Sequence, residues 1–342
     1  MTTDKQALSP RDARSKAPPI EEGFFAGING LQQWITVRGA RSDNPVLLLV
    51  GGPGSALSAM APFFAPWEQF FTLVQWDQPG AGATHAKRDN PPIGSLTIAR
   101  LASDGEAVAE LVSRRLCVGK LWIMGISGGS AVALTMVSGR PELFSGYVGC
   151  GQIVHWARQD ALSYSLLCEQ ARAAADAEVL AELERMGPPP YRDSAMDARK
   201  SKYAGAMTAA ERAAFAALEP ATLAALTSPP LAASYLAKDV QLEEPRALSF
   251  KTYDKLRKDL VAFDAATLGS RFALPLFFLQ GELDAFTVTS EVREFVSRIE
   301  APRKEIITIA GGGHSCIFLR DEILAALRKH IGSVTCGRRQ PL

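Results

Sequence analysis

A serine set between glycines is the strongest candidate for nucleophilic chemistry in this sequence. The segment Gly125-Ile-Ser-Gly-Gly129 matches the pattern G-x-S-x-G. It follows an apolar run typical of a buried strand, 121–124, and precedes a run typical of a helix, 130–134. A tight turn from strand to helix exposes a serine hydroxyl, and small glycines permit that turn. We expect Ser127 to be the nucleophile; the alternative is a glycine-rich turn with a capping serine.

A serine hydroxyl is a weak nucleophile and needs a neighbouring base. His314 lies in Gly311-Gly-Gly-His, directly after the last apolar run, so it could lean over the edge of a sheet toward Ser127. The other three histidines have ordinary explanations. His85 lies in an expected surface loop, His155 begins a helical segment, and His330 lies at the surface end of a helix. His314 is therefore the expected base.

The acid that orients this base should follow the preceding strand. The segment Gln280-Gly-Glu-Leu-Asp284 comes after an apolar run and offers two carboxylates, Asp284 and Glu282. The two side chains point to opposite sides of the turn, so only one can meet His314, and we expect Asp284. The chain order Ser127, Asp284, His314 is that of the α/β-hydrolase fold.

An acyl-transfer enzyme also needs backbone N–H groups for the developing oxyanion. One should come from Gly128, the residue after the nucleophile. The other should come from the loop Gly51-Gly-Pro-Gly54, where Gly52 is the better donor because Pro53 has no N–H. A phosphate-binding glycine loop is the alternative, but the Lys-Ser/Thr of a Walker motif does not follow.

Short apolar runs alternate with helical stretches over most of the chain. Asn29-Gly30 between two alternating runs indicates a hairpin. The runs typical of strands buried on both faces are 46–50, 71–76, 121–125, 144–148, 275–280 and 305–309. The helical stretches are 97–116, 130–138 ending at Gly139, and 323–331 ending at Gly332. This alternation predicts an α/β fold with a mostly parallel sheet flanked by helices.

The pattern changes between residues 152 and 269, where strands give way to alanine-rich helical segments, 162–186 and 208–226. The second opens with Thr208-Ala-Ala-Glu, which reads as a capping box. We interpret residues 152–269 as a helical lid inserted into a core of residues 21–151 and 270–342, after a flexible tail, 1–20. An independent helical domain is the alternative.

Composition narrows the class of protein further. The 342 residues carry 37 Lys and Arg against 36 Asp and Glu, a net charge of +1, which argues against a dedicated nucleic-acid or membrane-surface binder. The longest apolar run, 45–50, is too short to span a bilayer, and no signal segment is visible. Five scattered cysteines favour reduced thiols, and four dispersed histidines match no metal motif. We expect a cytoplasmic protein without metal or cofactor; its oligomeric state stays open.

These residues resemble the proline iminopeptidase branch of the α/β-hydrolases. Three motifs carry the resemblance: Gly51–Gly54 is similar to the branch's HGGPG loop, Trp76–Gly82 to its DQRGxG segment, and Gly125–Ser130 to its GxSWGS elbow. The resemblance covers residues 23–335 and is weakest in the lid. It implies a sheet core with a helical lid, no cofactor, and an acyl-enzyme mechanism using Ser127, Asp284 and His314.

Three residues depart from the branch's pattern. Val50 replaces the loop histidine, Pro79 the arginine, and Gly128 the tryptophan after the nucleophile. Aminopeptidases of the branch hold the substrate's amine with carboxylates in or near the lid. The pair Glu243-Glu244 is the most visible candidate here, against the alternative of a solvated charge pair.

An aromatic-rich segment, Met60–Trp67, follows the glycine loop. Its side chains could line an apolar acyl pocket, with Phe63 and Trp67 as substrate-binding candidates, or could belong to the hydrophobic core.

Together the features of the sequence predict a serine hydrolase that acts on a small peptide or amide with a free N-terminal residue. The alternatives are an esterase or lactonase for a small apolar acyl compound, and a non-catalytic ligand-binding protein of the same fold.

Overall fold

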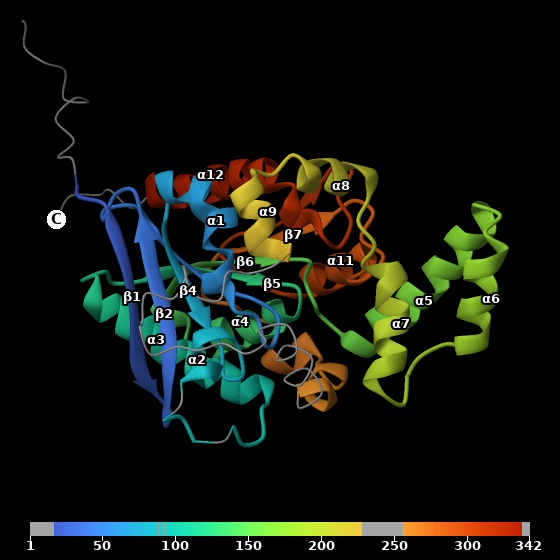
Figure 1. Ribbon diagram of the computed structural model, residues 1–342, viewed down its shortest axis with the longest axis horizontal. Helices are drawn as coiled ribbons and strands as arrows, with labels where there is room; N and C mark the ends of the chain where they lie inside the picture. The colour runs from blue at the N-terminus through green and yellow to red at the C-terminus, as the bar shows by residue number, and fades with distance from the viewer. Residues whose placement is uncertain (1–16, 88, 92, 228–255, 337–342) are drawn as a thin grey trace, which may run out of the picture.

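An eight-stranded sheet runs through the core of the protein (Figure 1). This computed structural model describes residues 17–87, 89–91, 93–227 and 256–336. In sheet order, β1-β2-β4-β3-β5-β6-β7-β8, neighbouring strands from β4 to β8 are parallel. At the other edge β1 pairs antiparallel with β2, and β2 pairs antiparallel with β4. The strands are β1 (Ile20–Ile28), β2 (Leu31–Gly39), β3 (Val46–Val50), β4 (Thr72–Asp77), β5 (Leu121–Ile126), β6 (Phe144–Cys150), β7 (Leu276–Gly281) and β8 (Lys304–Ile309). The predicted α/β class with a mostly parallel sheet is confirmed.

The β1–β2 hairpin turns at Asn29 and Gly30, which have φ values of 44° and 87°. Positive φ at both turn positions is what a two-residue hairpin with the right twist requires, so the Asn-Gly signal is confirmed. The resulting antiparallel pair carries the chain into β3, the first strand of the parallel part.

Helices cover both faces of the sheet, so alternate residues of β3 pack against helices on opposite faces. Leu47 and Leu49 pack with the α1 and α12 side, whereas Leu48 and Val50 pack with the α3 and α4 side. The flanking helices are α1 (Ala61–Phe64), α2 (Gly82–Ala86), α3 (Ile98–Arg115), α4 (Gly128–Gly139), α11 (Thr289–Arg298) and α12 (Arg320–Cys336). Short 3₁₀ helices are η1 (Leu57–Met60), η2 (Ala65–Gln69), η3 (Pro141–Leu143), η4 (Ala265–Leu268) and η5 (Cys316–Phe318).

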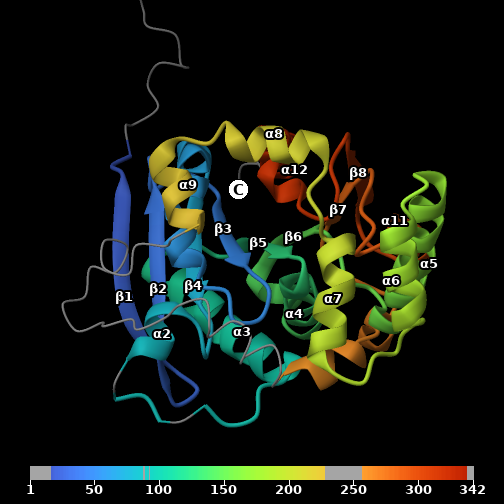
Figure 2. The same cartoon turned by 45° about the vertical axis from the view of Figure 1, so that its right-hand side comes forward.

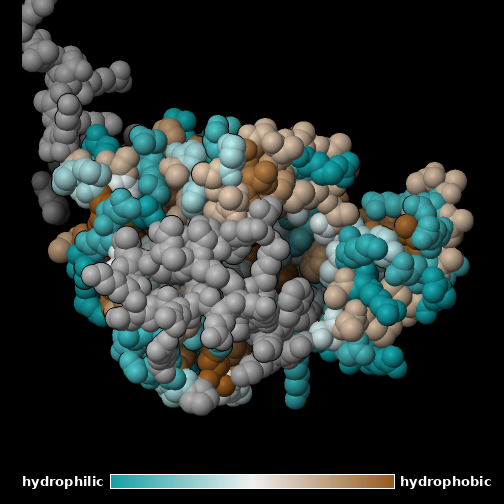
Figure 3. Space-filling model, in the orientation of Figure 1, coloured by the Kyte–Doolittle hydropathy of each residue, from teal (hydrophilic) through white to brown (hydrophobic). Residues whose placement is uncertain are grey.

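Between β6 and β7 the chain forms helices: α5 (Trp156–Ala173), α6 (Ala177–Met186), α7 (Ser194–Ala204), α8 (Ala209–Ala216) and α9 (Pro220–Thr227). Figures 1 and 2 show that α5, α6 and α7 project to one side, while α8 lies close to α12. The projecting surface mixes hydrophilic and hydrophobic residues (Figure 3). Where this helical segment joins the core, its first and last parts are hydrogen-bonded to each other: the Trp156 N–H donates to the Phe263 carbonyl at 3.1 Å. The predicted limits of the lid stay a prediction.

Local signals missed three boundaries. The stretch predicted as 162–186 breaks between α5 and α6, where Ala175 has φ 54° and Asp176 caps the next helix. The stretch 208–226 breaks before Pro220, which begins α9. Gly332 does not end the last helix, which continues to Cys336. One interior glycine costs a helix only ~1 kcal/mol, and α12 packs on the sheet through Ile323, among others.

His330 was expected at the surface, and that expectation is wrong. The residue is 3% exposed, and its ring lies 4.9 Å from the Phe277 ring, centroid to centroid. The expected surface position of His85 holds, although it lies in the short helix α2. In the described part of the chain, no helix combines the length and apolarity needed to cross a bilayer.

Candidate active site

Ser127 occupies a strained turn between β5 and α4. Its backbone has φ 51° and ψ −125°, a conformation that residues other than glycine rarely adopt. Two backbone hydrogen bonds hold it there: the Ser127 N–H donates to the Cys150 carbonyl at 2.8 Å, and the Ser127 carbonyl accepts from the Ser130 N–H at 2.8 Å. The turn lifts the serine side chain out of the regular strand at the carboxyl edge of the sheet.

The glycines around Ser127 are required by close packing. A Cβ at Gly125 would lie 2.6 Å from the Ser130 Cα. A Cβ at Gly129 would overlap the carbonyl oxygens of Val50 and Gly51. The G-x-S-x-G pattern therefore reflects how tightly α4 starts against β3 and β5.

His314 lies beside this serine. It follows β8 through the loop Ala310–Gly313, and its Nε2 is 2.8 Å from the Ser127 Oγ. Its Nδ1 is 3.2 Å from the Asp284 Oδ2, so one imidazole links the serine hydroxyl to a carboxylate. The structure thus brings together all three residues that were predicted to act together, from the ends of β5, β7 and β8.

Asp284, not Glu282, is the carboxylate that meets His314. The Asp284 side chain is fully buried, and its Oδ1 accepts the N–H groups of Phe286 and Thr287, each at 2.8 Å. The Thr287 hydroxyl donates to Oδ2 at 2.5 Å. Burial alone would raise the pKa of Asp284, but His314 and the two hydrogen bonds from Thr287 together hold that pKa below its usual value.

Glu282 points elsewhere and has a different role. Its Oε2 accepts the Gly311 N–H at 2.9 Å, so it braces the loop that precedes His314. Thr287 was missed by sequence reasoning. A hydroxyl residue three positions after a candidate acid is the signal that could have found it, because it can turn back and bond the carboxylate.

The two predicted oxyanion donors lie next to each other. A Cβ built on Gly52 would be 3.9 Å from the Gly128 backbone nitrogen. Gly128 is the first residue of α4, so the helix itself provides no acceptor for its N–H. The Gln78 side chain fixes the neighbouring peptide by donating to the Gly51 carbonyl at 2.9 Å. The use of Gly52 and Gly128 as donors stays a prediction.

Phe63 and Trp67, which were expected to line a substrate pocket, do not do so. Phe63 and Trp67 are both 0% exposed and belong to the core between the sheet and α12. Phe63 packs edge-on against Phe64 and Phe318, with centroids 4.9 and 5.6 Å away. An aromatic-rich composition suits core and pocket equally, so it could not separate the two. The candidate pair Glu243 and Glu244 lies outside the described residues.

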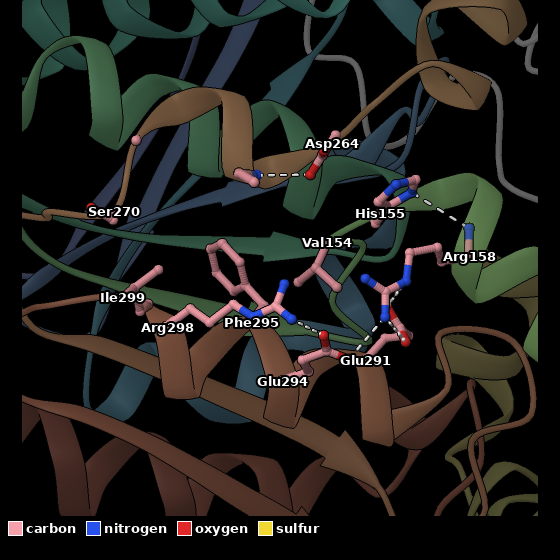
Figure 4. A pocket seen from close by; sticks show the side chains of 12 residues that line it. Val154, His155, Arg158, Asp264, Ser270, Glu291, Glu294, Phe295, Arg298 and Ile299 are labelled. Carbon is pink, nitrogen blue, oxygen red and sulfur yellow. Dashed lines mark hydrogen bonds and ion pairs between the residues drawn. The ribbon is translucent and has the colours of Figure 1, made fainter.

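A cavity of about 410 Å³ lies away from Ser127, where the chain enters and leaves its helical segment (Figure 4). Its charged side chains are bonded to one another: Arg158 approaches Glu291 at 3.0 Å and Glu294 at 2.9 Å. Its lining includes none of the three linked residues. Among the residues the structure describes, no cluster of His, Cys, Asp and Glu could hold a metal ion.

Known proteins provide a comparison for this geometry. No protein-family model matches the sequence. The probable aminopeptidase YbaC of Bacillus subtilis (strain 168) is 26% identical over 293 residues, which are 84% of this chain and 89% of that protein.

Two solved structures share the fold at low identity. A proline iminopeptidase-related protein of Thermus thermophilus is 18% identical, with a TM-score of 0.59 over 92% of this chain and 98% of that one. E-2-(acetamidomethylene)succinate hydrolase is 16% identical, with a TM-score of 0.59 over 92% and 99%. With the sheet order and the strand-to-helix turn described above, these likenesses show that the chain has the α/β-hydrolase fold and is similar to proteins of the proline iminopeptidase-like branch.

Proposed function

We propose that this protein is a serine hydrolase that works through an acyl-enzyme. One observation carries the proposal: the Ser127 Oγ lies 2.8 Å from the His314 Nε2, while the Nδ1 of the same ring lies 3.2 Å from the Asp284 Oδ2. These are the contacts that a nucleophile, a general base and an orienting acid need. The strained backbone of Ser127 supports the same role, because strain of this kind gathers at active sites.

The chemistry follows from these contacts. Ser127 attacks the substrate carbonyl carbon while its hydroxyl proton passes to the His314 Nε2. The resulting imidazolium is stabilised by the buried Asp284 carboxylate, and the oxyanion takes N–H hydrogen bonds from Gly52 and Gly128. His314 then gives its proton to the leaving group, and water releases the acyl group by the same steps in reverse.

The proposed substrate is a small peptide or amide with a free N-terminal residue. The relation to a probable aminopeptidase supports this class, and so does the likeness to a proline iminopeptidase-related structure. A substrate ammonium group in an apolar pocket needs a carboxylate partner. Glu243 and Glu244 are the proposed partners.

A cytoplasmic location is proposed as well, supported by the free thiols of Cys117, Cys150, Cys168 and Cys316.

The test compares hydrolysis of a proline anilide with a free amine and of its N-acetylated twin, with Ser127→Ala as the blank. A strong preference for the free amine supports the aminopeptidase. Negligible rates on both anilides, together with Ser127-dependent cleavage of a simple ester, would overturn the aminopeptidase and keep the serine hydrolase. No Ser127-dependent reaction, and no labelling of Ser127 by a fluorophosphonate probe, would overturn both.

A further inference from the structure

Glu211 is a buried acidic residue that the proposed mechanism does not use. It lies in the first turn of α8, is 0% exposed, and forms the capping box with Thr208 that the sequence predicted. Its Oε2 accepts the Thr208 N–H at 2.8 Å, which is the ordinary capping contact. Its Oε1 reaches away from the helix and accepts the Gly313 N–H at 2.6 Å, directly before His314 in the chain.

The capping partner contacts the same loop. The Thr208 hydroxyl accepts the Glu211 N–H at 3.1 Å and donates to the Gly311 carbonyl at 2.7 Å. A Cβ at Gly313 would lie 3.0 Å from the Thr208 Cγ2, so a larger residue there would crowd the two segments. Both members of the capping box therefore hold the loop Gly311–Gly313.

The loop is held from its other side by the turn that carries Asp284. The Gly311 N–H donates to Glu282, and the Leu283 N–H donates to the Gly312 carbonyl at 2.7 Å. Farther along, Phe215 of α8 packs edge-on against Phe318, with centroids 5.1 Å apart. Figure 2 shows α8 beside α12, with β7 and β8 next to them. The loop that presents His314 is thus fixed between the acid's turn and α8.

A helix cap alone does not explain the burial of Glu211. Most capping residues lie at the surface, whereas a buried carboxylate loses its hydration and is costly unless it is well bonded. No ion pair with a lysine or arginine is found for Glu211 within the described residues, and its two oxygens accept backbone N–H groups instead. The more informative of these two bonds is the one to Gly313, because it acts on the loop of His314.

We propose that Glu211 is a positioning residue: it holds the Gly313–His314 peptide so that the imidazole faces Ser127. The inference rests on the proposed function, because it assigns Glu211 a role in the acylation of Ser127. Glu211 acts through the loop and does not touch the reacting atoms. Loss of its bond to Gly313 should loosen His314 and slow proton transfer, while leaving the substrate's own contacts in place.

The experiment measures the acylation of Ser127 by 4-nitrophenyl acetate, as kcat and KM and as the rate of the first turnover. Glu211→Ala should lower the acylation rate by roughly 10- to 100-fold with little change in KM, the loss typical of a misplaced catalytic group. Glu211→Gln should fall between wild type and Glu211→Ala, because its single amide oxygen can accept only one of the two N–H groups. Thr208→Val, which replaces the hydroxyl with a methyl group of similar size, should also slow acylation.

Asp176→Ala is the matched control. Asp176 caps α6 in the same helical segment by accepting the Val179 N–H at 3.0 Å, a contact that does not involve the loop of His314. Its loss should lower stability by ~1 kcal/mol, as removal of a cap does, and leave acylation unchanged. A general weakening of the lid would instead slow this variant as much as Glu211→Ala.

The outcomes separate the two proposals. If wild type is acylated at Ser127 and a folded Glu211→Gln or Thr208→Val variant reacts equally fast, the positioning role is overturned and the serine hydrolase stands. If Asp176→Ala is slowed as much as the Glu211 variants, the positioning role is overturned as well. If wild type and Ser127→Ala do not differ, the proposed function fails, and the role of Glu211 falls with it.

Discussion

The phenyl ring of Phe286 lies nearly flat against the imidazole of His314, with centroids 4.4 Å apart and planes 23° apart. Phe286 belongs to the same turn as Asp284, whose Oδ1 accepts its N–H. The Trp156 ring also packs edge-on against Phe286, with centroids 6.1 Å apart. One short turn therefore supplies both the carboxylate that orients the imidazole and the apolar face that limits its rotation.

Replacement of Phe286 should slow the acylation of Ser127. A stacked aromatic pair contributes ~0.5–1.5 kcal/mol, so Phe286→Ala should lower the rate by up to about tenfold. Phe286→Tyr keeps the flat face and should react at nearly the wild-type rate. Phe286→Leu keeps apolar bulk without that face; wild-type acylation in this variant would show that stacking has no part in the effect. Fluorophosphonate labelling of Ser127 gives the rates.

The residues of the site could be predicted because each follows a strand signal. G-x-S-x-G, the acidic turn and the glycine-rich histidine loop come after three apolar runs, and parallel strands bring their ends to one edge. The contacts of Glu211 and Phe286 could not be predicted in this way. The capping box is a local pattern, but the partner of its second oxygen, Gly313, lies 102 residues later.

Other errors have the same cause. His330 looked like a surface residue at a helix end, but Phe277 from a strand far away in the sequence buries it. Phe63 and Trp67 have aromatic side chains that suit core and pocket alike, and only the packing of the sheet against α12 decides between them. Local propensity predicts elements; contacts between distant segments decide what those elements cover.

The backbone strain at Ser127 predicts an unusual order of stability. Ser127→Gly and Ser127→Ala both remove the Oγ bond to His314, but only alanine keeps a Cβ at φ 51°. Relief of this strain should make the glycine variant more stable than the alanine variant by about 1 kcal/mol. Urea unfolding monitored by circular dichroism measures the difference.

Ser103, an exposed residue inside α3, provides the matched comparison. At a regular helical position the order should reverse, with Ser103→Ala more stable than Ser103→Gly by about 1 kcal/mol. An alanine variant at position 127 that equals or exceeds its glycine counterpart would show that the serine's backbone carries no strain.

The lowered pKa of Asp284 predicts how the stability of the protein changes at acidic pH. Because the folded-state pKa lies below the unfolded value of about 3.9, the Asp284 carboxylate stabilises the fold above that value. This contribution is lost as the pH falls from about 4 through the lower folded-state pKa. Asp284→Asn cannot titrate there, so its free energy of unfolding should approach that of wild type as the pH is lowered.

Urea unfolding of both proteins between about pH 5 and pH 3 tests this, since carboxylates common to the two cancel in the difference. Thr287→Val removes the hydroxyl that donates to the Asp284 Oδ2 and should raise the pKa of Asp284 toward its usual value. In that variant the acid-dependent part of the difference should therefore be smaller. A gap between wild type and Asp284→Asn that stays constant or widens in acid contradicts the assignment.

Two cysteines should differ sharply in reactivity toward iodoacetamide. The Cys316 Sγ lies 3.7 Å from the Cys150 Sγ, and both residues are buried. Their hydrogen bond and the burial raise the pKa of the Cys316 thiol well above its usual range, so little reactive thiolate forms there. Cys117 is exposed at the end of α3. At about pH 8, peptide mapping should find Cys117 alkylated in the native protein and Cys316 alkylated only in concentrated urea. Equal labelling of both in the native state would mean that the loop after His314 opens readily, contrary to the fixed position that its contacts with α8 imply.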